Sequence, residues 1–534
     1  MIRRAITVIV VLCVSAILVA AAPSRPAFHT SDRCVACHNG LLTASGQDVS
    51  IGFAWRASIM ANSSRDPYWQ ASVRRETIDH AQSTAAIEDE CAACHMPIAR
   101  YEAKLRGERG RVFAHLPFAA DGNHERSAAD GVSCAVCHQI SAARLGTRES
   151  FNGGFLVEPP PADNARPEYG PFELEPGHRR IMLTSTEGYR PTQSTHIRDS
   201  ELCATCHTLL TEALGPDGKV IGSLPEQVPY QEWLHSDYKA TQSCQSCHMP
   251  TVAEPAPITR VFGTPRDGVA RHTFVAANFF MQRMLNRYRD TLDVAALPQE
   301  LSAAADGTIE YLQSQAAAVS VRQLSIGGDR LRLEVTVENH GGHKLPTAYP
   351  ARRAWLHVVA RDRNGRVVFE SGGLNADGSV TGNDNDRDAK KFEPHFTEIT
   401  SADQVQIYES ILGDASGGVT TGLLQAVRYL KDNRLLPRGF DKKTAEADIA
   451  VRGGAADDDD FRDGSDRVRY VIPVAMSAGP FTVDAELLYQ PIGFRWANNL
   501  KKYDAAEPRR FTSYYDAMST ASAVTLARAS MTTQ

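Results

Sequence analysis

The stretch IEDECAACHMPIAR, from Ile87 to Arg100, holds two cysteines three positions apart and a histidine directly behind the second. One copy of this pattern fits a redox thiol pair, half of a zinc site or an attachment site for a c-type haem. The rest of the chain distinguishes these alternatives, because the pattern recurs. Other Cys-x-x-Cys-His pentads lie at positions 34–38, 134–138, 203–207 and 244–248.

The cysteines of the chain are confined to these pentads, apart from Cys13 in an apolar N-terminal run. No cysteine is therefore left over for a structural disulfide. Zinc knuckles need no histidine behind each second cysteine, and a thioredoxin-type pair normally occurs once, near a βαβ pattern. The repeated pentad instead predicts haem c, in five copies, with its iron. The attachment residues are Cys34, Cys37, Cys91, Cys94, Cys134, Cys137, Cys203, Cys206, Cys244 and Cys247.

The spacing of the pentad has a physical reason. Residues three and four apart share one face of a helical turn, so both thiols can form thioethers to the two vinyl groups of one porphyrin. The histidine is then placed beneath the ring, where it binds iron as the proximal ligand. The predicted proximal ligands are His38, His95, His138, His207 and His248.

The second axial ligand of each iron must come from elsewhere in the chain. A histidine lies a short way upstream of every pentad; it is too tethered to cap its own ring easily, but it can cap a neighbouring one. His272 in RHTF follows the last pentad and is a further candidate. We expect His29 to be a weaker candidate for a distal ligand, and His115 and His178 to be alternative candidates. We expect Met60 to pack in the core and not to bind iron. The predicted distal ligands are His80, His124, His196, His235 and His272.

The nature of the second ligand separates electron transfer from catalysis. Two strong protein ligands keep iron six-coordinate, whereas an open position can bind and reduce a substrate. No pentad ends in lysine instead of histidine. This excludes the lysine-ligated active haem that is typical of the nitrite-reducing multihaem enzymes.

The length and charge of the chain limit the kinds of molecule that it is expected to bind. The chain has 534 residues and a net charge of −6, with no basic block or stripe, so we expect no nucleic-acid partner. Arg3 and Arg4 precede an apolar run, residues 5–22, which ends in alanines. This pattern is typical of a secretory signal cleaved after Ala21, and an uncleaved membrane anchor is the alternative. We expect an exported protein, in the periplasm or at the cell surface.

The pattern of apolar and polar residues along the chain predicts a multidomain α+β fold. Residues 1–22 form the signal or anchor, 26–270 a mainly helical, loop-rich pentahaem cytochrome c domain, and 271–319 a helical linker. Residues 320–534 alternate in the manner of strands and predict an all-β, sandwich-like domain with a long insertion. Asn364-Gly365 marks a hairpin within it. A helix is expected over 422–433.

Two features of the C-terminal half stand apart. The acidic loops at 383–389 and 457–466 allow calcium binding, but neither fits an EF-hand, so we expect solvated loops. ENHGGHKLPTAYPARRAW, residues 338–355, places His340 and His343 around two glycines. Either His343 reaches across a domain interface to cap a haem, or the segment is a structural turn in which His343 is hydrogen-bonded locally.

The stretches DGVSCAVCHQI, ELCATCHTLLTE, PYQEWLHSDY, QSCQSCHMP and GHKLPTAYPARRAWLHV resemble bacterial multihaem cytochromes c. The group includes the tetrahaem electron acceptors of hydroxylamine oxidoreductase, and the resemblance covers most of the chain. It implies a helical array of closely stacked haems, mostly with two histidine ligands. It implies no activity for the C-terminal β domain.

Three functions follow as hypotheses. The first is periplasmic or cell-surface electron transfer through five haems, with redox proteins, including membrane-associated ones, as partners. The second is an oxidoreductase that acts on a small nitrogen or sulfur compound at one five-coordinate haem. The third is a subunit of a cytochrome assembly in which the β domain docks. We expect an electron carrier rather than an enzyme, because no catalytic cluster stands out; the sequence gives no oligomeric state.

Overall fold

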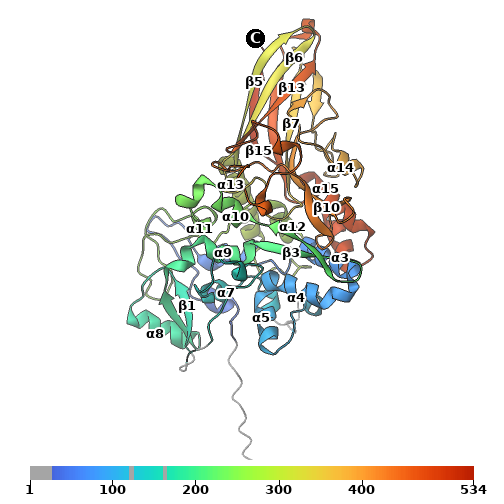
Figure 1. Cartoon of the computed structure of the whole chain (residues 1–534). Helices are drawn as coiled ribbons and strands as arrows, with labels where there is room; N and C mark the ends of the chain where they lie inside the picture. Colours follow the sequence, from blue (N-terminus) through green and yellow to red (C-terminus); the bar gives the residue numbers. More distant parts are fainter. Residues whose placement is uncertain (1–26, 119–125, 160, 162–164, 534) are drawn as a thin grey trace, which may run out of the picture.

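The computed structural model describes residues 27–118, 126–159, 161 and 165–533. The predicted signal segment and His124 lie outside these residues. Figure 1 shows a broad helical part below and a narrow tower of long strands above it. The predicted fold class is confirmed: helices prevail in the N-terminal half and strands in the C-terminal half. The domain boundaries themselves stay a prediction.

The N-terminal half consists of short helices and a few short strands. Its α-helices are α1 (Asp32–Val35), α2 (Ile51–Arg56), α3 (Pro67–Asp79), α4 (Thr84–His95), α5 (Pro97–Leu105), α6 (Arg126–Ala129), α7 (Cys134–Gln139), α8 (Pro176–Ser185), α9 (Ser200–His207), α10 (Pro229–Leu234) and α11 (Cys244–His248). Its strands are β1 (Arg166–Gly170), β2 (Tyr189–Gln193), β3 (Leu209–Leu214) and β4 (Val220–Gln227).

The pentads sit on short helices, as predicted. Those of α4, α7, α9 and α11 lie wholly within their helix, and the first begins in α1 and continues in turns. The sequence did not predict the strands of this half. β1 lies inside the proline- and glycine-rich stretch 158–177, and it pairs in parallel with β2.

Two helices connect the halves, as predicted. They are α12 (Phe279–Arg287) and α13 (Pro298–Gln315). Pro298 stands at the first position of α13, and Glu300 accepts a hydrogen bond from the Leu297 N–H, which closes the helix start. The second helix ends earlier than expected, because the run from Ala317 is already a strand.

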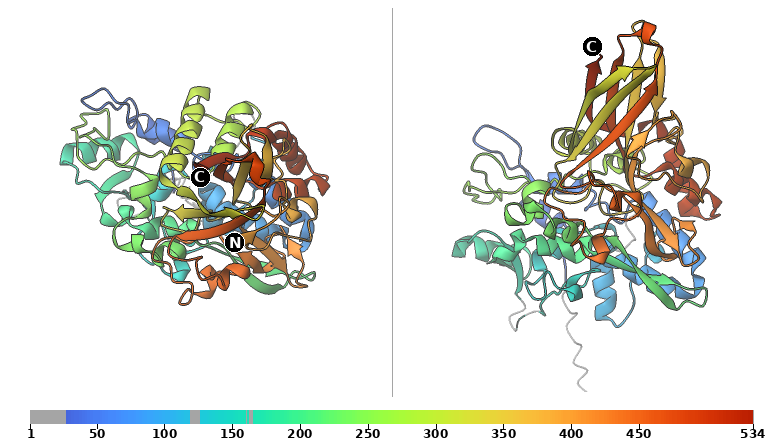
Figure 2. Two further views of the ribbon diagram at one scale, coloured as in Figure 1. Left: turned by 90° about the horizontal axis from the view of Figure 1, so that it is seen from above. Right: turned by 45° about the horizontal axis from the view of Figure 1, so that its top comes forward.

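Strands of the C-terminal half form two sheets. One has the order β5-β6-β13-β9, and the other β11-β10-β7-β14-β15, with β8 beside β7 and β12 beside β10. Figures 1 and 2 show the long strands rising together as a tower. The strands are β5 (Ala317–Gly327), β6 (Arg330–Asn339), β7 (Arg353–Arg361), β8 (Val367–Ser371), β9 (Glu398–Ile399), β10 (Ile407–Asp414), β11 (Val419–Thr420), β12 (Ala426–Asp432), β13 (Ser465–Pro473), β14 (Thr482–Gln490) and β15 (Val524–Thr532). The helices here are α14 (Asp384–Arg387), α15 (Phe494–Asn499) and α16 (Ala506–Asp516).

The hairpin at Asn364-Gly365 is confirmed. β7 and β8 pair antiparallel across it, and Gly365 has a φ of +78°. The Asp362 carboxylate accepts hydrogen bonds from the N–H groups of Asn364 and Arg366, which holds the loop closed.

The helix expected over 422–433 is wrong. This segment forms β12, which pairs antiparallel with β10. Its apolar spacing fitted a helix, but the hydrogen-bonding edge of β10 offers the backbone partners at this place. Tertiary pairing therefore overrides the local pattern.

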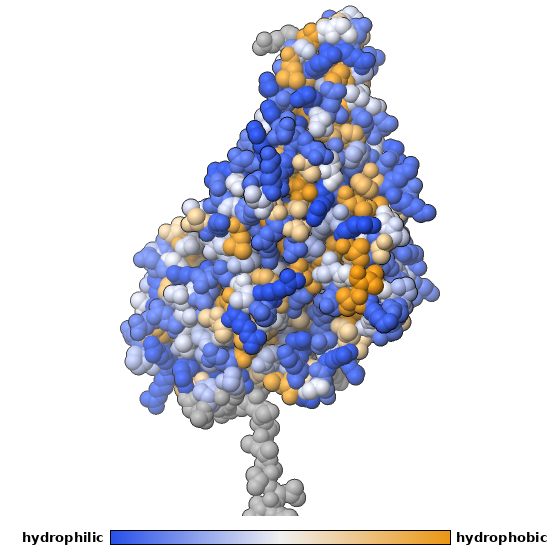
Figure 3. Space-filling view, viewed as in Figure 1, coloured by the Kyte–Doolittle hydropathy of each residue, from blue (hydrophilic) through white to orange (hydrophobic). Residues whose placement is uncertain are grey.

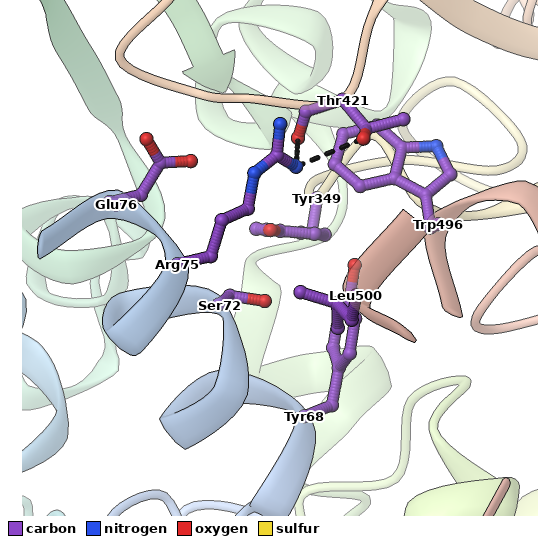
Figure 4. A pocket seen from close by; sticks show the side chains of 8 residues that line it. All are labelled: Tyr68, Ser72, Arg75, Glu76, Tyr349, Thr421, Trp496 and Leu500. Carbon is purple, nitrogen blue, oxygen red and sulfur yellow. Dashed lines mark hydrogen bonds between the residues drawn. The ribbon is translucent and has the colours of Figure 1, made fainter. Parts of the chain in front are cut away.

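The two halves meet along α3. Figure 4 shows Tyr68, Ser72 and Arg75 of this helix facing residues of the C-terminal half. The Arg75 guanidinium donates to both the carbonyl and the hydroxyl of Thr421, at 2.6 and 2.9 Å. One buried apolar cluster runs from α3 through α12 into both sheets, so the halves share a core.

The surface in view is mostly hydrophilic, and its apolar residues form separate patches (Figure 3). Nowhere in the described chain is a helix long and apolar enough to span a bilayer.

Candidate haem-attachment sites

We number the candidate sites in chain order. They are site 1 (Cys34, Cys37, His38), site 2 (Cys91, Cys94, His95), site 3 (Cys134, Cys137, His138), site 4 (Cys203, Cys206, His207) and site 5 (Cys244, Cys247, His248). The cysteines of all these sites are partly buried and free, with no disulfide among the described residues. The thiols are thus present in the form that thioether formation needs.

The pentad histidines are oriented by the main chain. In four of them Nδ1 lies against a carbonyl oxygen, which fixes the proton on Nδ1 and turns Nε2 toward a ligand. The partners are Ile258 for His38 (2.5 Å), Ser63 for His95 (2.9 Å), Tyr169 for His138 (2.5 Å) and Val275 for His248 (2.5 Å).

Burial keeps these imidazoles neutral. Desolvation is the first cause that lowers the pKa of each, to about 4 for His95 and His248. The pKa of His207 is lowered by burial and then by Arg352. A neutral imidazole with a free Nε2 is the form that binds iron, so the residues present fit a haem.

Two pentad histidines face a second imidazole. The rings of His138 and His272 have centroids 6.4 Å apart and planes 16° from parallel. Those of His248 and His343 are 6.2 Å apart, with planes 10° from parallel. Because a metal stands about 2 Å from an imidazole nitrogen, two imidazoles on opposite sides of one metal have centroids roughly 6 Å apart. Both pairs therefore have the spacing of two axial ligands.

The sequence allows two interpretations of His343. In the structure, its ring faces His248 of site 5. Its Nδ1 is 3.0 Å from the carbonyl oxygen of Lys344, so the ring is also hydrogen-bonded locally. The two interpretations are compatible, since a local bond at Nδ1 leaves Nε2 for iron.

A buried network of charges holds the segment that carries His343. The Lys344 ammonium, with no exposed surface, pairs with Asp432 at 2.7 Å. Arg434 pairs with Asp432 at 2.8 Å and with Glu232 of α10 at 3.0 Å. Glu232 in turn accepts the Lys344 N–H and the Thr347 hydroxyl, at 3.1 and 2.5 Å. The network ties α10 and β12 to the backbone directly behind His343.

Two further predicted distal ligands, His196 and His235, contact protein groups in the structure. Both ring nitrogens of His196 are engaged, Nδ1 with the Ser194 hydroxyl (2.6 Å) and Nε2 with the Ile140 carbonyl (2.8 Å). His235 lies with Nε2 3.0 Å from the Asp441 carbonyl and its ring against Phe440. Neither arrangement supports the prediction of an iron ligand, because the ring nitrogens named here already contact oxygen atoms of the protein.

His80 remains a candidate. It is buried, and its Nε2 has no hydrogen-bond partner in the described structure, although it lies 4.0 Å from a Glu76 carboxylate oxygen. An imidazole nitrogen that is buried without a partner is available to a metal. The reserve His178 is bonded through Nε2 to the Phe262 carbonyl, and His29 packs on Tyr189.

Sequence reasoning missed two parts of the sites. The Trp69 indole stacks on the His95 ring, with centroids 4.3 Å apart and planes 5° from parallel. The charge network behind His343 was missed as well. Lone charged residues in the sequence carry no sign that they will be buried together, so no pattern could have found it.

Thiols of different sites lie close to one another. Cys34 and Cys134 are near enough for each thiol to shift the pKa of the other, and the same holds for Cys94 with Cys206 and for Cys203 with Cys244. Cys137 also lies close enough to feel the charge of Cys206. Site 3 thus adjoins sites 1 and 4, and site 4 adjoins sites 2 and 5.

No protein-family model matches the chain, and no curated protein matches it. Among solved structures it is similar to a penta-haem cytochrome c552 from Thermochromatium tepidum, at 14% sequence identity and a TM-score of 0.50. The match covers 95% of this chain and 99% of the other. The chain thus shares the fold of a multihaem cytochrome c over nearly its whole length.

Proposed function

We propose that this chain is an exported electron-transfer protein that holds five c-type haems in its five pentads. The observation that carries the proposal is the closeness of thiols that belong to different sites. Site 1 is next to site 3, site 3 is next to site 4, and sites 2 and 5 are both next to site 4. Every site therefore has another site as its neighbour. A set of redox centres with no gap between members is what electron transfer through a protein needs.

Each haem would supply an iron that cycles between its ferric and ferrous states. The residues of this chain hold the group and set its ligands. The cysteines would attach it, the pentad histidines would bind its iron, and His272 and His343 would supply a second histidine at sites 3 and 5. Two histidine ligands keep iron six-coordinate, which suits electron transfer with little rearrangement.

Export and partners belong to the same proposal. The basic and then apolar start of the chain, ending in alanines, supports export, to the periplasm or the cell surface. Redox proteins on either side of the chain, including membrane-associated ones, would deliver and accept the electrons.

The direct test is the mass of the intact protein, made in a host that attaches c-type haem and measured under denaturing conditions. We expect the mass of the chain plus five haems, since thioethers survive denaturation. An apo mass, or a mass with fewer haems, contradicts the proposal. A Cys-to-Ala change at both cysteines of site 5 should remove one haem, and the same change at Cys13 should remove none.

A second function, an oxidoreductase acting on a small nitrogen or sulfur compound, is favoured by one observation. Within the described residues, His38, His95 and His207 face no second imidazole at the spacing found for sites 3 and 5. A haem there that took no further ligand could bind a substrate. A high-spin signal from one iron by electron paramagnetic resonance, with binding of CO or cyanide, would support this function; low-spin iron alone would exclude it.

A further inference from the structure

The acidic loop at 457–466 is solvated only in part: Asp457, Asp459 and Asp463 are exposed, whereas Asp458 and Asp466 are buried. The Asp458 side chain is 6% exposed and that of Asp466 is 0% exposed. Both face His395, whose ring is fully buried against Phe461. Asp466 is held inside because it belongs to β13, where it pairs with Val337 of β6.

His395 is held in one tautomer. Its Nδ1 lies 2.9 Å from the Gln406 amide nitrogen and 3.1 Å from that of Asn433. The main chain fixes both amides, because the Gln406 oxygen accepts the Phe396 N–H and the Asn433 oxygen accepts the Glu409 N–H. Nδ1 is therefore an acceptor, and the proton of the neutral ring lies on Nε2. From there it is donated to Asp458 at 3.1 Å.

One carboxylate oxygen of Asp466 accepts hydrogen bonds, and the other accepts none. Oδ2 accepts the Tyr408 hydroxyl at 2.7 Å and the Gln406 amide at 3.3 Å. Oδ1 is buried without a hydrogen-bond partner, and it points into the cluster, 3.9 Å from His395 Nε2. A buried oxygen without a partner costs free energy unless something outside the chain meets it.

The charges of the cluster are also uncompensated. Within the described part of the chain, neither Asp458 nor Asp466 forms an ion pair with a lysine or an arginine. Lys442 is close, but its ammonium donates to the main-chain oxygens of Ala455 and Asp458. In the same loop, Oδ1 of Asp460 is also buried without a hydrogen-bond partner, whereas Oδ2 of Asp460 pairs with the Arg467 guanidinium at 3.3 Å. Carboxylates gathered in this way repel one another unless a cation joins them.

The spacing fits a cation. One carboxylate oxygen of Asp458 and one of Asp466 lie within 4.8 Å of each other, and each is within 4.8 Å of a ring nitrogen of His395. Oxygens about 2.4 Å from one Ca²⁺ stand up to roughly 5 Å apart. His395 does not serve as a ligand, because its Nε2 keeps the proton. This leaves oxygen ligands, which are the choice of Ca²⁺ rather than of zinc or copper.

We propose that Asp458 and Asp466 bind one Ca²⁺, with Asp460 beside them, and that His395 positions Asp458. The site would join the start of β13 to the loop before it. That loop reaches the N-terminal half, since the Asp237 N–H donates to the Arg438 carbonyl and Gly439 donates to Asp463. Bound Ca²⁺ would thus stiffen the contact between the halves near site 5.

The test uses the haem-loaded protein after dialysis against a chelator. Calorimetric titration with CaCl₂ should give one Ca²⁺ per chain, and saturating CaCl₂ should raise the thermal unfolding midpoint. Asp466→Asn keeps the shape and the Tyr408 contact but removes the charge, so its affinity should fall at least about tenfold. Asp459→Asn changes an exposed carboxylate of the same loop and should leave binding unchanged.

Two outcomes overturn the proposal. If the wild-type protein shows neither binding heat nor a shifted midpoint with Ca²⁺, Asp466 holds a proton instead of a cation. If Zn²⁺ or Mn²⁺ binds more tightly than Ca²⁺ and His395→Gln abolishes that binding, His395 is a ligand and the site is not a calcium site. Should Asp466→Asn fail to fold, Asp458→Asn gives the same comparison, and equal Ca²⁺ affinity in it contradicts the assignment.

Discussion

The imidazoles of His248 and His343 face each other with ring centroids 6.2 Å apart and planes 10° from parallel. His248 ends α11 in the helical half, whereas His343 lies between β6 and β7 of the β-rich half. The second half of the chain thus contributes a candidate ligand to site 5.

Replacing His343 by alanine should leave the iron of site 5 five-coordinate. We expect one haem in five to become high-spin, and CO binding to rise by one molecule per chain over the wild-type value. Electron paramagnetic resonance and a CO titration measure both. His340→Ala is the matched control, because its side chain is 46% exposed and lies three residues earlier. An unchanged spin state in His343→Ala would rule out this residue as the ligand.

Lys344→Met should weaken the hold on His343. The change removes one partner of a fully buried pair, although Arg434 still compensates Asp432. We expect a loss of about 3 kcal/mol in the free energy of unfolding. We also expect partial high-spin character at site 5, which a purely structural role would not produce. Lys443→Met, at an exposed position, should change neither quantity.

The histidines at 272 and 196 should respond in opposite ways. His272 faces His138, so His272→Ala should give one high-spin haem, at site 3. His196 has both nitrogens bonded to protein, so His196→Ala should leave all haems in their wild-type spin state. Optical and resonance spectra of the two variants decide this. A high-spin haem in His196→Ala would show that His196 binds iron, as the sequence predicts.

Glu226 should make stability depend on pH. Burial raises the pKa of this carboxyl from about 4.5 to about 7, while its hydrogen bond from Thr211 opposes the shift. The folded state therefore holds a proton that the unfolded state releases between these values, so the contribution is full below pH 4.5 and is lost as pH rises through about 7. The loss amounts to about 3 kcal/mol.

Urea unfolding of the wild type and of Glu226→Gln at several pH values measures the contribution of Glu226 to the free energy of unfolding. The variant should lose less stability than the wild type between pH 5 and pH 7.5. Glu212→Gln, exposed on the paired strand β3, is the control and should follow the wild type. Parallel curves for wild type and Glu226→Gln would show that Glu226 is already ionised in the folded protein.

Local patterns in the sequence predicted much of this architecture. The pentad spacing placed the motif helices, and Asn364-Gly365 placed a hairpin, because both depend on residues that are neighbours in the chain. The segment 422–433 shows the limit of such patterns. Its apolar residues fit a helix, and only the edge of β10 decides that it is a strand.

The candidate site was predictable in part for the same reason. The cysteines and histidines of each pentad are local, but a distal ligand depends on how distant segments pack. Upstream position suggested His196 and His235, yet the structure gives both protein partners and turns His343 toward site 5. Burial of Asp466 was likewise invisible, since a run of aspartates in a sequence is typical of a solvated loop.

A coulometric redox titration of the purified, haem-loaded protein, monitored by the haem absorbance, tests most directly whether the chain carries five haems that exchange electrons. We expect full reduction to take up five electrons per chain, with a change in haem absorbance that accompanies all of them. Uptake of fewer than five electrons, or uptake without a haem absorbance change, would contradict this expectation.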